Sequence, residues 1–324
     1  MSRLYRPARL LAASVIVGIL AAPGAAHAAD ASTPLSAAEM AAALKAVGTT
    51  STTAAAHGWQ ATVKLTGGSV SGSESFVVDP VAKVSFFRVH VSGEVVSEYD
   101  AAGRGVYTYL SDPISRSTLQ MMGRPAVRYS FKADRSVKLD AFELSPAAVL
   151  TDDDIRQPGT KTVHDDGSAD YRLVDEDSTA VTLHVAPAGV LTSARVVGDG
   201  LNMTLAYTYR AQHLTLPSAA TTISAAALAT GETYRNMPAF VQEVAHETAV
   251  DTRRAANGHR VKVSSLRRIA RADVGSFNTA LDVKMIKVGN VAGGVRVSAT
   301  NPWTHRTVAY TITSSGTKVI VRKK

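Results

Sequence analysis

The stretch HVAPAGVLTSARVVGDGLNMTLAYTYRAQHLTLP, residues 184–217, decides the fold class of the longer part of this chain. Apolar and polar residues alternate along it, and Gly-containing turns divide it into segments of strand length. Its last segment places Met203, Leu205, Tyr207 and Tyr209 on one face of a strand. The stretch therefore predicts the closing strands of an antiparallel meander, and its pattern shows no arrangement of residues typical of a catalytic site.

The same alternation begins much earlier, after one predicted helix. Ser36 and Glu39 have the spacing of a capping box, and Gly48 is the predicted end of this helix. From Trp59 the period changes to two, and strand-like runs follow one another. At Phe86 and Phe87 the alternation slips by one residue, which predicts a β-bulge or a strand covered on both faces.

The first 28 residues have the features of a secretory signal peptide. Three arginines precede a short apolar run, and Ala26 and Ala28 offer small residues for cleavage near Ala28. We therefore expect a secreted or cell-envelope protein. The chain contains no cysteine, so it can form neither a disulfide nor a lipid-anchored cysteine. No later stretch approaches the roughly 18 apolar residues of a transmembrane helix, so no transmembrane segment is expected in the mature chain.

Charge is distributed unequally along the 324 residues, whose formal net charge is +8. Residues 29–231 contain 21 acidic and 16 basic side chains, whereas residues 232–324 contain 6 acidic and 16 basic ones. This contrast predicts two domains with different surfaces, 29–217 and 232–324, joined by an Ala/Thr-rich linker at 218–231. For an exported protein, two interpretations of the basic domain stay open: a merely solvated basic surface, or one that meets an anionic envelope surface; nucleic acid is not the expected partner.

The basic domain is predicted to contain one long helix followed by a small sheet. Apolar residues recur at helical spacing over 232–256, and Asn257-Gly258 has the composition of a helix end. Short runs joined by Gly and Asn turns then predict antiparallel strands. The whole chain is thus assigned to the α+β class.

A search for catalytic spacing indicates that the protein is not an enzyme. His246-Glu247 begins like a zinc-protease motif, but residue 250 is Val and the second histidine is missing. The other histidines are dispersed along the sequence. No cofactor and no metal site are expected.

What the strands offer instead is a large apolar face. Such a face either lines a ligand cavity or forms an ordinary solid core against helices, and the pattern alone leaves both alternatives open. The residues that would line a lipid-binding cavity are Trp59, Val63, Leu65, Phe76, Phe86, Tyr109, Phe131, Met203, Leu205 and Tyr207.

Residues from about Ser36 to Pro217 resemble the LolA/LppX-like family of lipoprotein and lipid carriers. The resemblance lies in the order of parts: an N-terminal helix, a first strand opened by Trp59, further strands, a helical insert, and the closing segments LHVAPAGVLTSARVV and MTLAYTYRAQHLTLP. It implies a half-open β-barrel that wraps around helices and binds an acyl chain. Two features depart from the family: the lipobox cysteine of many actinobacterial relatives is absent, and the arginine that closes the carriers' cavity has no assignable counterpart, although Arg88 lies in a predicted strand.

The second domain resembles the globular head of type IV pilins, through its long helix, the turn ANGHRVKVSSL and the trailing strands. A pilin also needs a strongly apolar leading helix, which residues 218–236 lack. We therefore expect a pilin-like head used for binding or spacing, and not a fibre subunit.

These observations predict a secreted, non-enzymatic protein that holds a lipid or lipoprotein acyl chain in an apolar cavity, as a carrier or envelope sensor. The alternative is a cell-surface protein–protein interaction module whose domains have solid cores and no ligand cavity.

Overall fold

The computed structural model describes residues 30–67, 70–91, 93–139, 144–150, 157–174, 179–198 and 200–324. The predicted signal peptide lies outside these residues. The chain divides into two compact units: unit 1 comprises Met1–Tyr109 and Ala133–Leu216, and unit 2 comprises Leu110–Lys132 and Pro217–Lys324. The excursion at Leu110–Lys132, which the sequence placed in the first domain, thus belongs to unit 2.

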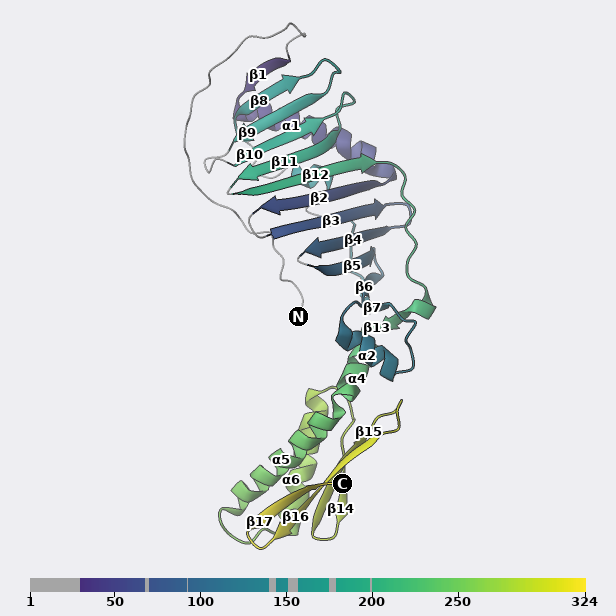
Figure 1. Ribbon diagram of the computed structural model, residues 1–324, viewed down its shortest axis with the longest axis vertical. Helices are drawn as coiled ribbons and strands as arrows, with labels where there is room; N and C mark the ends of the chain where they lie inside the picture. Colours follow the sequence, from purple (N-terminus) through teal and green to yellow (C-terminus); the bar gives the residue numbers. More distant parts are fainter. Residues whose placement is uncertain are drawn as a thin grey trace. The chain divides into compact units, whose positions relative to one another are not determined.

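Unit 1 is built on a large antiparallel sheet (Figure 1). Its strand order is β1-β8-β9-β10-β11-β12-β2-β3-β4-β5-β6. The sheet is not closed into a barrel, and the predicted half-open arrangement is compatible with this order. The strands are β1 (Ala31–Leu35), β8 (Gly159–Val163), β9 (Ala169–Val174), β10 (Ala180–Val185), β11 (Leu191–Gly198), β12 (Leu201–Tyr209), β2 (Trp59–Gly67), β3 (Val70–Asp79), β4 (Val84–Val91), β5 (Glu94–Ala101) and β6 (Gly105–Tyr109).

The register of the strands defines two faces, because directly paired residues point to the same side of a sheet. Leu205 pairs with Val63, and Val63 pairs with Glu74. We call the face that carries these three side chains the inner face and the opposite one the outer face.

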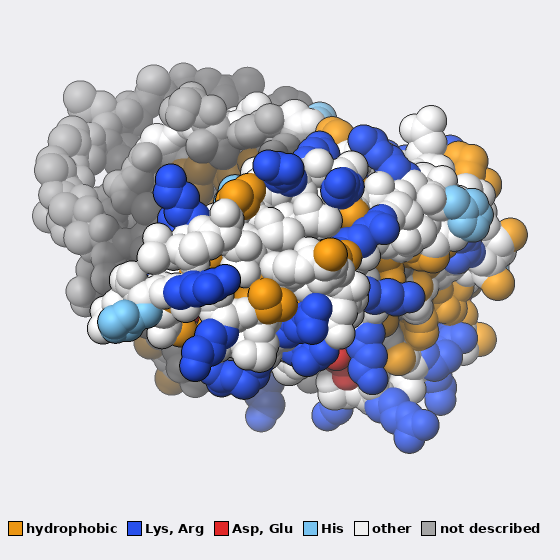
Figure 2. All heavy atoms as spheres, turned by 90° about the horizontal axis from the view of Figure 1, so that it is seen from below, with side chains coloured by type: hydrophobic (Ala, Val, Ile, Leu, Met, Phe, Trp, Pro, Cys, Tyr) orange, Lys and Arg blue, Asp and Glu red, His pale blue; other side chains and the backbone are white. Residues whose placement is uncertain are grey.

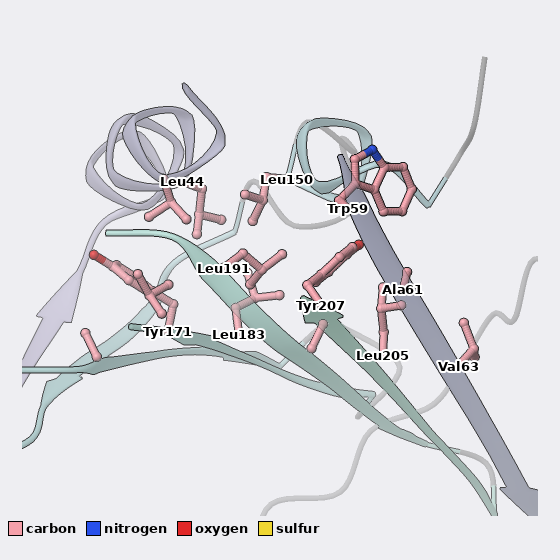
Figure 3. Close-up of a cluster of buried hydrophobic side chains, with 14 of the residues drawn as sticks. Leu44, Trp59, Ala61, Val63, Leu150, Tyr171, Leu183, Leu191, Leu205 and Tyr207 are labelled. Carbon is pink, nitrogen blue, oxygen red and sulfur yellow. The ribbon is translucent and has the colours of Figure 1, made fainter. Parts of the chain in front are cut away.

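Two helices cover part of the inner face. Helix α1 (Ala37–Ala54) begins at the predicted capping box, where the Ser36 and Glu39 side chains each bond to the other residue's backbone N–H. It runs on to Ala54, past its predicted end, and is followed by the 3₁₀ turn η1 (Ala55–His57). Within the described residues of the predicted helical insert, 136–139 and 144–150, only α3 (Pro146–Val149) is helical. Figure 3 shows Leu44 and Leu150 pointing from these helices toward inner-face side chains of the sheet.

At Phe86 and Phe87 the structure excludes the bulge, the first of the two predicted alternatives. Strand β4 pairs with β3 and β5 in unbroken register, so there is no bulge at this position. Phe87 lies on the inner face and Phe86 on the outer face, and both are half-buried. The strand irregularity occurs elsewhere, between His184 and Val185 in the β10–β11 pair.

Unit 2 contains the helices α2, α4, α5 and α6, a four-stranded antiparallel sheet and a short pair of parallel strands. The sheet order is β14-β15-β16-β17, and β13 pairs with β7. The elements are α2 (Pro113–Met121), β7 (Tyr129–Ala133), η3 (Ala219–Thr221), β13 (Thr222–Ser224), α4 (Ala225–Arg235), α5 (Met237–Ala256), α6 (Val263–Ala280), β14 (Lys287–Val291), β15 (Gly294–Thr300), β16 (Thr307–Ser315) and β17 (Lys318–Lys323).

Unit 2 departs from the sequence prediction in three places. Residues 218–231, expected as a linker, form η3, β13 and most of α4. The expected single long helix is two helices, α4 and α5, which meet at Asn236 ahead of Pro238. Helix α6 occupies a segment in which we expected a turn and the first strand, and its Leu266, Ala270 and Val274 are buried in the core of the unit.

Among the described residues, no helix combines the length and the apolar character needed to cross a membrane.

Candidate functional site

Most of the ten predicted lining residues come together in unit 1. Trp59, Val63, Phe76, Leu205 and Tyr207 belong to one buried cluster, and Met203 packs against it. Leu65 lies on the same inner face, opposite Met203. The other three lie elsewhere: Phe86 and Tyr109 are on the outer face, and Phe131 lies in strand β7 of unit 2.

The shared cluster is densely packed where α1 and α3 cover it. The Trp59 and Tyr207 rings lie 6.2 Å apart, and the Tyr207 hydroxyl donates a hydrogen bond of 3.0 Å to the carbonyl of Leu144. Leu205 is 2% exposed. The sequence left two alternatives open for this face, a ligand cavity or a solid core. Among the described residues, side chains from the helices and the sheet form a solid core here.

Beyond this core, the apolar side chains of the inner face are half-buried or exposed in the part of the chain that the structure describes. Along one cross-strand row, buried Leu205 and Val63 are followed by Glu74, Val89 and Val96, and Val96 is 49% exposed. In the next row Val196, Met203 and Leu65 are half-buried. We call this half-buried to exposed set the inner apolar strip; it consists of Leu65, Val89, Val96, Val196, Leu201 and Met203.

Three carboxyl groups lie on the inner face beside this strip. Glu74 is on β3, and Glu98 and Asp100 are on β5. Burial among apolar neighbours raises the pKa of each, and the negative charge of Asp100 adds to the effect on the pKa of Glu98. Thr108 donates a hydrogen bond of 3.1 Å to Glu98, which opposes this rise. No local sequence pattern identifies this group, because its members come from different strands and only the strand register brings them together.

The outer face around β4 also differs from the expectation. Arg88, the arginine considered for closing a cavity, is on the outer face and exposed. Its guanidinium lies 5.4 Å from the centre of the Phe86 ring and donates a hydrogen bond of 3.2 Å to Ser97. It therefore points away from the buried cluster.

Near the other end of the sheet, the outer face carries a group of possible metal ligands. His164, Asp170 and His184 each offer one ligand atom, and these atoms lie within 4.8 Å of one another. The two histidines are twenty positions apart in the sequence, and only the pairing of β8, β9 and β10 shows that they are neighbours.

Unit 2 presents a strongly basic surface. Figure 2 shows Lys and Arg side chains spread over this end of the molecule, with little acidic surface among them. A hollow of about 330 Å³ lies between the α5–α6 loop and the β16–β17 turn, and Arg260 and Lys262 are among its lining residues. Both side chains are exposed. This surface can attract anions through its excess of positive charge.

Comparison with known proteins gives only distant likenesses. No family model matches the chain, and no curated protein is similar to it. An uncharacterized conserved protein from Thermus thermophilus is 13% identical, with a TM-score of 0.28, over 55% of this chain and 96% of the other. A DUF1329 family protein from Desulfovibrio piger is 12% identical, with a TM-score of 0.24, over 58% of this chain and 98% of the other. Likenesses at this level assign neither a fold nor a function, so the resemblances to LolA/LppX-like carriers and to pilin heads stay predictions.

Proposed function

We propose that unit 1 is a non-enzymatic binding domain that holds the acyl chain of a lipid or lipoprotein along the inner face of its sheet. One observation supports this most directly: the apolar inner face continues past its helical cover as the half-exposed inner apolar strip. An uncovered apolar surface that joins a core is the usual mark of a binding site for an apolar partner.

The energetics favour an extended apolar ligand. Each methylene that leaves water gains about 0.8 kcal/mol, so a chain of ten buried methylenes gains about 8 kcal/mol before the cost of ordering it. Shape and apolar area suffice for such binding, and no catalytic group is required. Because the core under α1 and α3 is filled, the ligand lies on the strip and not inside the core.

The carboxyl groups beside the strip select among lipids. An anionic head group near Glu74 meets partly buried carboxyls of the same sign when these are ionised, whereas a neutral amide or hydroxyl can donate hydrogen bonds to them. We therefore expect acyl amides and other neutral or cationic lipids to bind better than fatty acids.

The test uses adjacent residues of β11 that point to opposite faces. Val196 belongs to the inner apolar strip, and Val197 is 39% exposed on the outer face. Binding of a fluorescent acyl amide is titrated for the wild type, Val196→Asp and Val197→Asp. The proposal predicts at least a tenfold loss of affinity for Val196→Asp, about 1.4 kcal/mol, and wild-type affinity for Val197→Asp.

Equal affinities in all three proteins, or no binding of the probe at all, would contradict acyl-chain binding on this face. If the strip instead binds another protein, acyl probes should fail to bind. Binding of the protein partner should then be lost in Val196→Asp and kept in Val197→Asp. That outcome would favour the interaction-module alternative.

The proposed setting is extracytoplasmic. The support for it is the signal-peptide composition of residues 1–28 together with the absence of cysteine from the sequence. Amino-terminal sequencing of the protein from the culture medium or the envelope fraction tests this, with cleavage near Ala28 as the expected result and an intact terminus as the contrary one.

A further inference from the structure

The group His164, Asp170 and His184 is arranged around a carboxylate that faces two imidazoles. His184 Nδ1 lies 2.6 Å from Asp170 Oδ1, and His164 Nε2 lies 3.2 Å from Asp170 Oδ2. The three side chains are 43%, 33% and 27% exposed in the order His184, Asp170, His164. The group is therefore accessible to a small ion from solvent and yet partly shielded.

The orientation of His164 is supported by a second carboxylate. Asp30 Oδ2 lies 3.2 Å from His164 Nδ1, on the ring atom that does not face Asp170. Metal-binding histidines commonly hydrogen-bond through their other ring nitrogen to a carboxylate, which fixes the ring and makes the ligating nitrogen more basic. The pair Asp30–His164 has this arrangement.

The hairpin that carries two of these residues does not depend on them for its shape. The His164 N–H donates to the carbonyl of Ser168, and the Gly167 N–H donates to the carbonyl of His164. Asp166 accepts hydrogen bonds of 2.8 and 2.6 Å from the backbone and hydroxyl of Ser168. Backbone bonds and Asp166 thus close the turn, so the His164 and Asp170 side chains are free for another role.

We propose that His164, Asp170 and His184 bind one divalent first-row transition-metal ion, with Asp30 as the residue that positions His164. Two imidazoles and one carboxylate form a ligand set that Zn²⁺ and its neighbours in the series accept. This site is on the outer face and is independent of the acyl-chain site proposed above.

The distances fit such an ion with little movement. Bonds of about 2.0–2.1 Å in a tetrahedral site place ligand atoms about 3.3 Å apart. The 3.2 Å separation of His164 Nε2 and Asp170 Oδ2 already meets this, whereas His184 Nδ1, 2.6 Å from Asp170 Oδ1, must move away by about 0.7 Å. All three ligand atoms lie within 4.8 Å of one another, so they must also draw together around the ion. His184 is the most exposed of the three, so its side chain has room to turn.

The local charge favours a cation. Two carboxylates, Asp30 and Asp170, each lie 3.2 Å from a ring nitrogen of His164, and their negative charge attracts a cation. With three protein ligands, the fourth position is open to water or to a group brought by a partner.

The first measurement is isothermal titration of the protein, purified without a histidine tag, with Zn²⁺ alone. We expect one ion per chain. The double variant His164→Ala/His184→Ala should lose this binding, whereas the matched double variant His90→Ala/His213→Ala, which removes two exposed histidines from the same unit, should retain it. Asp30→Asn should weaken binding about 10–100-fold, as expected for a residue that positions a ligand.

Electron paramagnetic resonance of the Cu²⁺-loaded protein provides a second readout. Nitrogen hyperfine structure from two imidazoles in the wild type, and from one in His184→Ala, is the expected result. The inference is overturned if Zn²⁺ binds the folded His164→Ala/His184→Ala variant as tightly as the wild type, or if the wild type binds no ion. In either case the three side chains form only a hydrogen-bonded surface group. Circular dichroism spectra of every variant establish that they are folded.

Discussion

Leu205 and Leu65 are residues of the same type on the same sheet face in different surroundings. Leu205 lies in the buried cluster, while Leu65 is half-buried in the inner apolar strip. We predict that Leu205→Trp lowers the free energy of unfolding by about 1–3 kcal/mol, because a filled core resists added volume. Leu65→Trp should change it by less than about 0.5 kcal/mol.

Urea denaturation of the two variants measures this difference. If Leu205→Trp is as stable as the wild type, the space beneath α1 and α3 holds a cavity, and the acyl chain would bind inside the core and not on the strip.

The carboxyl group of Glu98 makes stability depend on pH. Burial raises its pKa in the folded protein above the ordinary value of 4.5, so the folded state holds this proton more tightly than the unfolded state does. The stabilising effect of the protonated form is complete below pH 4.5 and is lost as the pH rises through the folded-state pKa. Glu98→Gln, which keeps an oxygen that can accept the Thr108 hydrogen bond, should therefore be more stable than the wild type at pH 7 and similar to it below pH 4.5.

Chemical denaturation of both proteins at pH 4 and pH 7 tests this sign. A Glu98→Gln variant that is less stable than the wild type at pH 7 would show that the ionised carboxylate is favourably paired in the folded protein.

At the residue scale, the sequence identified one face of two strands and missed the register between the others. Alternation with a period of two placed Val63 and Leu65 on one face of β2, and Met203 and Leu205 on one face of β12. In the structure these two faces lie on the same side of the sheet, because Leu205 pairs with Val63 and Met203 with Leu65. In β4 the apolar alternation changes phase between Phe86 and Phe87, so periodicity could not assign Phe86 to the outer face. His164 and His184 are neighbours only through strand pairing, and no local pattern reports that.

At the element scale, helix α1 is attached to the sheet at the strand irregularity. The backbone of Leu191, which follows the β10–β11 turn, is bonded by two side chains: its N–H donates to Ser51 Oγ at 2.9 Å, and its carbonyl accepts from the Tyr209 hydroxyl at 2.6 Å. Ser51 is fully buried. Ser51 of helix α1 thus accepts the hydrogen bond of the Leu191 backbone N–H.

We predict that Ser51→Ala lowers the free energy of unfolding by about 1–3 kcal/mol, because it leaves a buried N–H without an acceptor. The neighbouring Thr50 is exposed, and its hydroxyl donates a hydrogen bond within its own helix, to the carbonyl of Ala46. Thr50→Ala is therefore the matched control, with an expected change within about 0.5 kcal/mol. Equal effects of the two substitutions in thermal or chemical denaturation would contradict a stabilising role for the hydrogen bond between Ser51 and Leu191.

The elements that the sequence predicted are those with strong local signals. Helix α1 has a capping box, and α5 has an apolar stripe and ends at Asn257, whose left-handed backbone favours Asn or Gly. Helix α6 lacks a side-chain cap at its start and buries only a narrow stripe. Residues 225–231 of α4 are rich in Ala and Thr, and this composition predicts neither an amphipathic helix nor a loop. They form a helix whose Leu228 packs in a small buried cluster.

At the scale of the whole molecule, the two units differ in charge, and the basic surface of unit 2 is predicted to bind anionic lipid surfaces. The Debye length falls from about 30 Å at 0.01 M salt to about 8 Å at 0.15 M, so attraction by exposed Lys and Arg weakens over this range. Sedimentation with vesicles containing anionic lipid should show binding that fades between these concentrations. Arg260→Glu/Lys262→Glu should reduce it further, and vesicles of neutral lipid serve as the control. Binding that is unaffected by salt would contradict an electrostatic attachment.

The central claim is that unit 1 carries a lipid or lipoprotein acyl chain on its inner sheet face. Native mass spectrometry of the protein purified from its own host, followed by extraction of whatever is bound, tests it most directly. The account predicts discrete added masses that are released as acyl-containing molecules and are diminished in Val196→Asp but kept in Val197→Asp. A protein that shows only its own mass, and stays so after incubation with neutral and cationic lipids, would contradict the claim and favour an interaction module with solid cores.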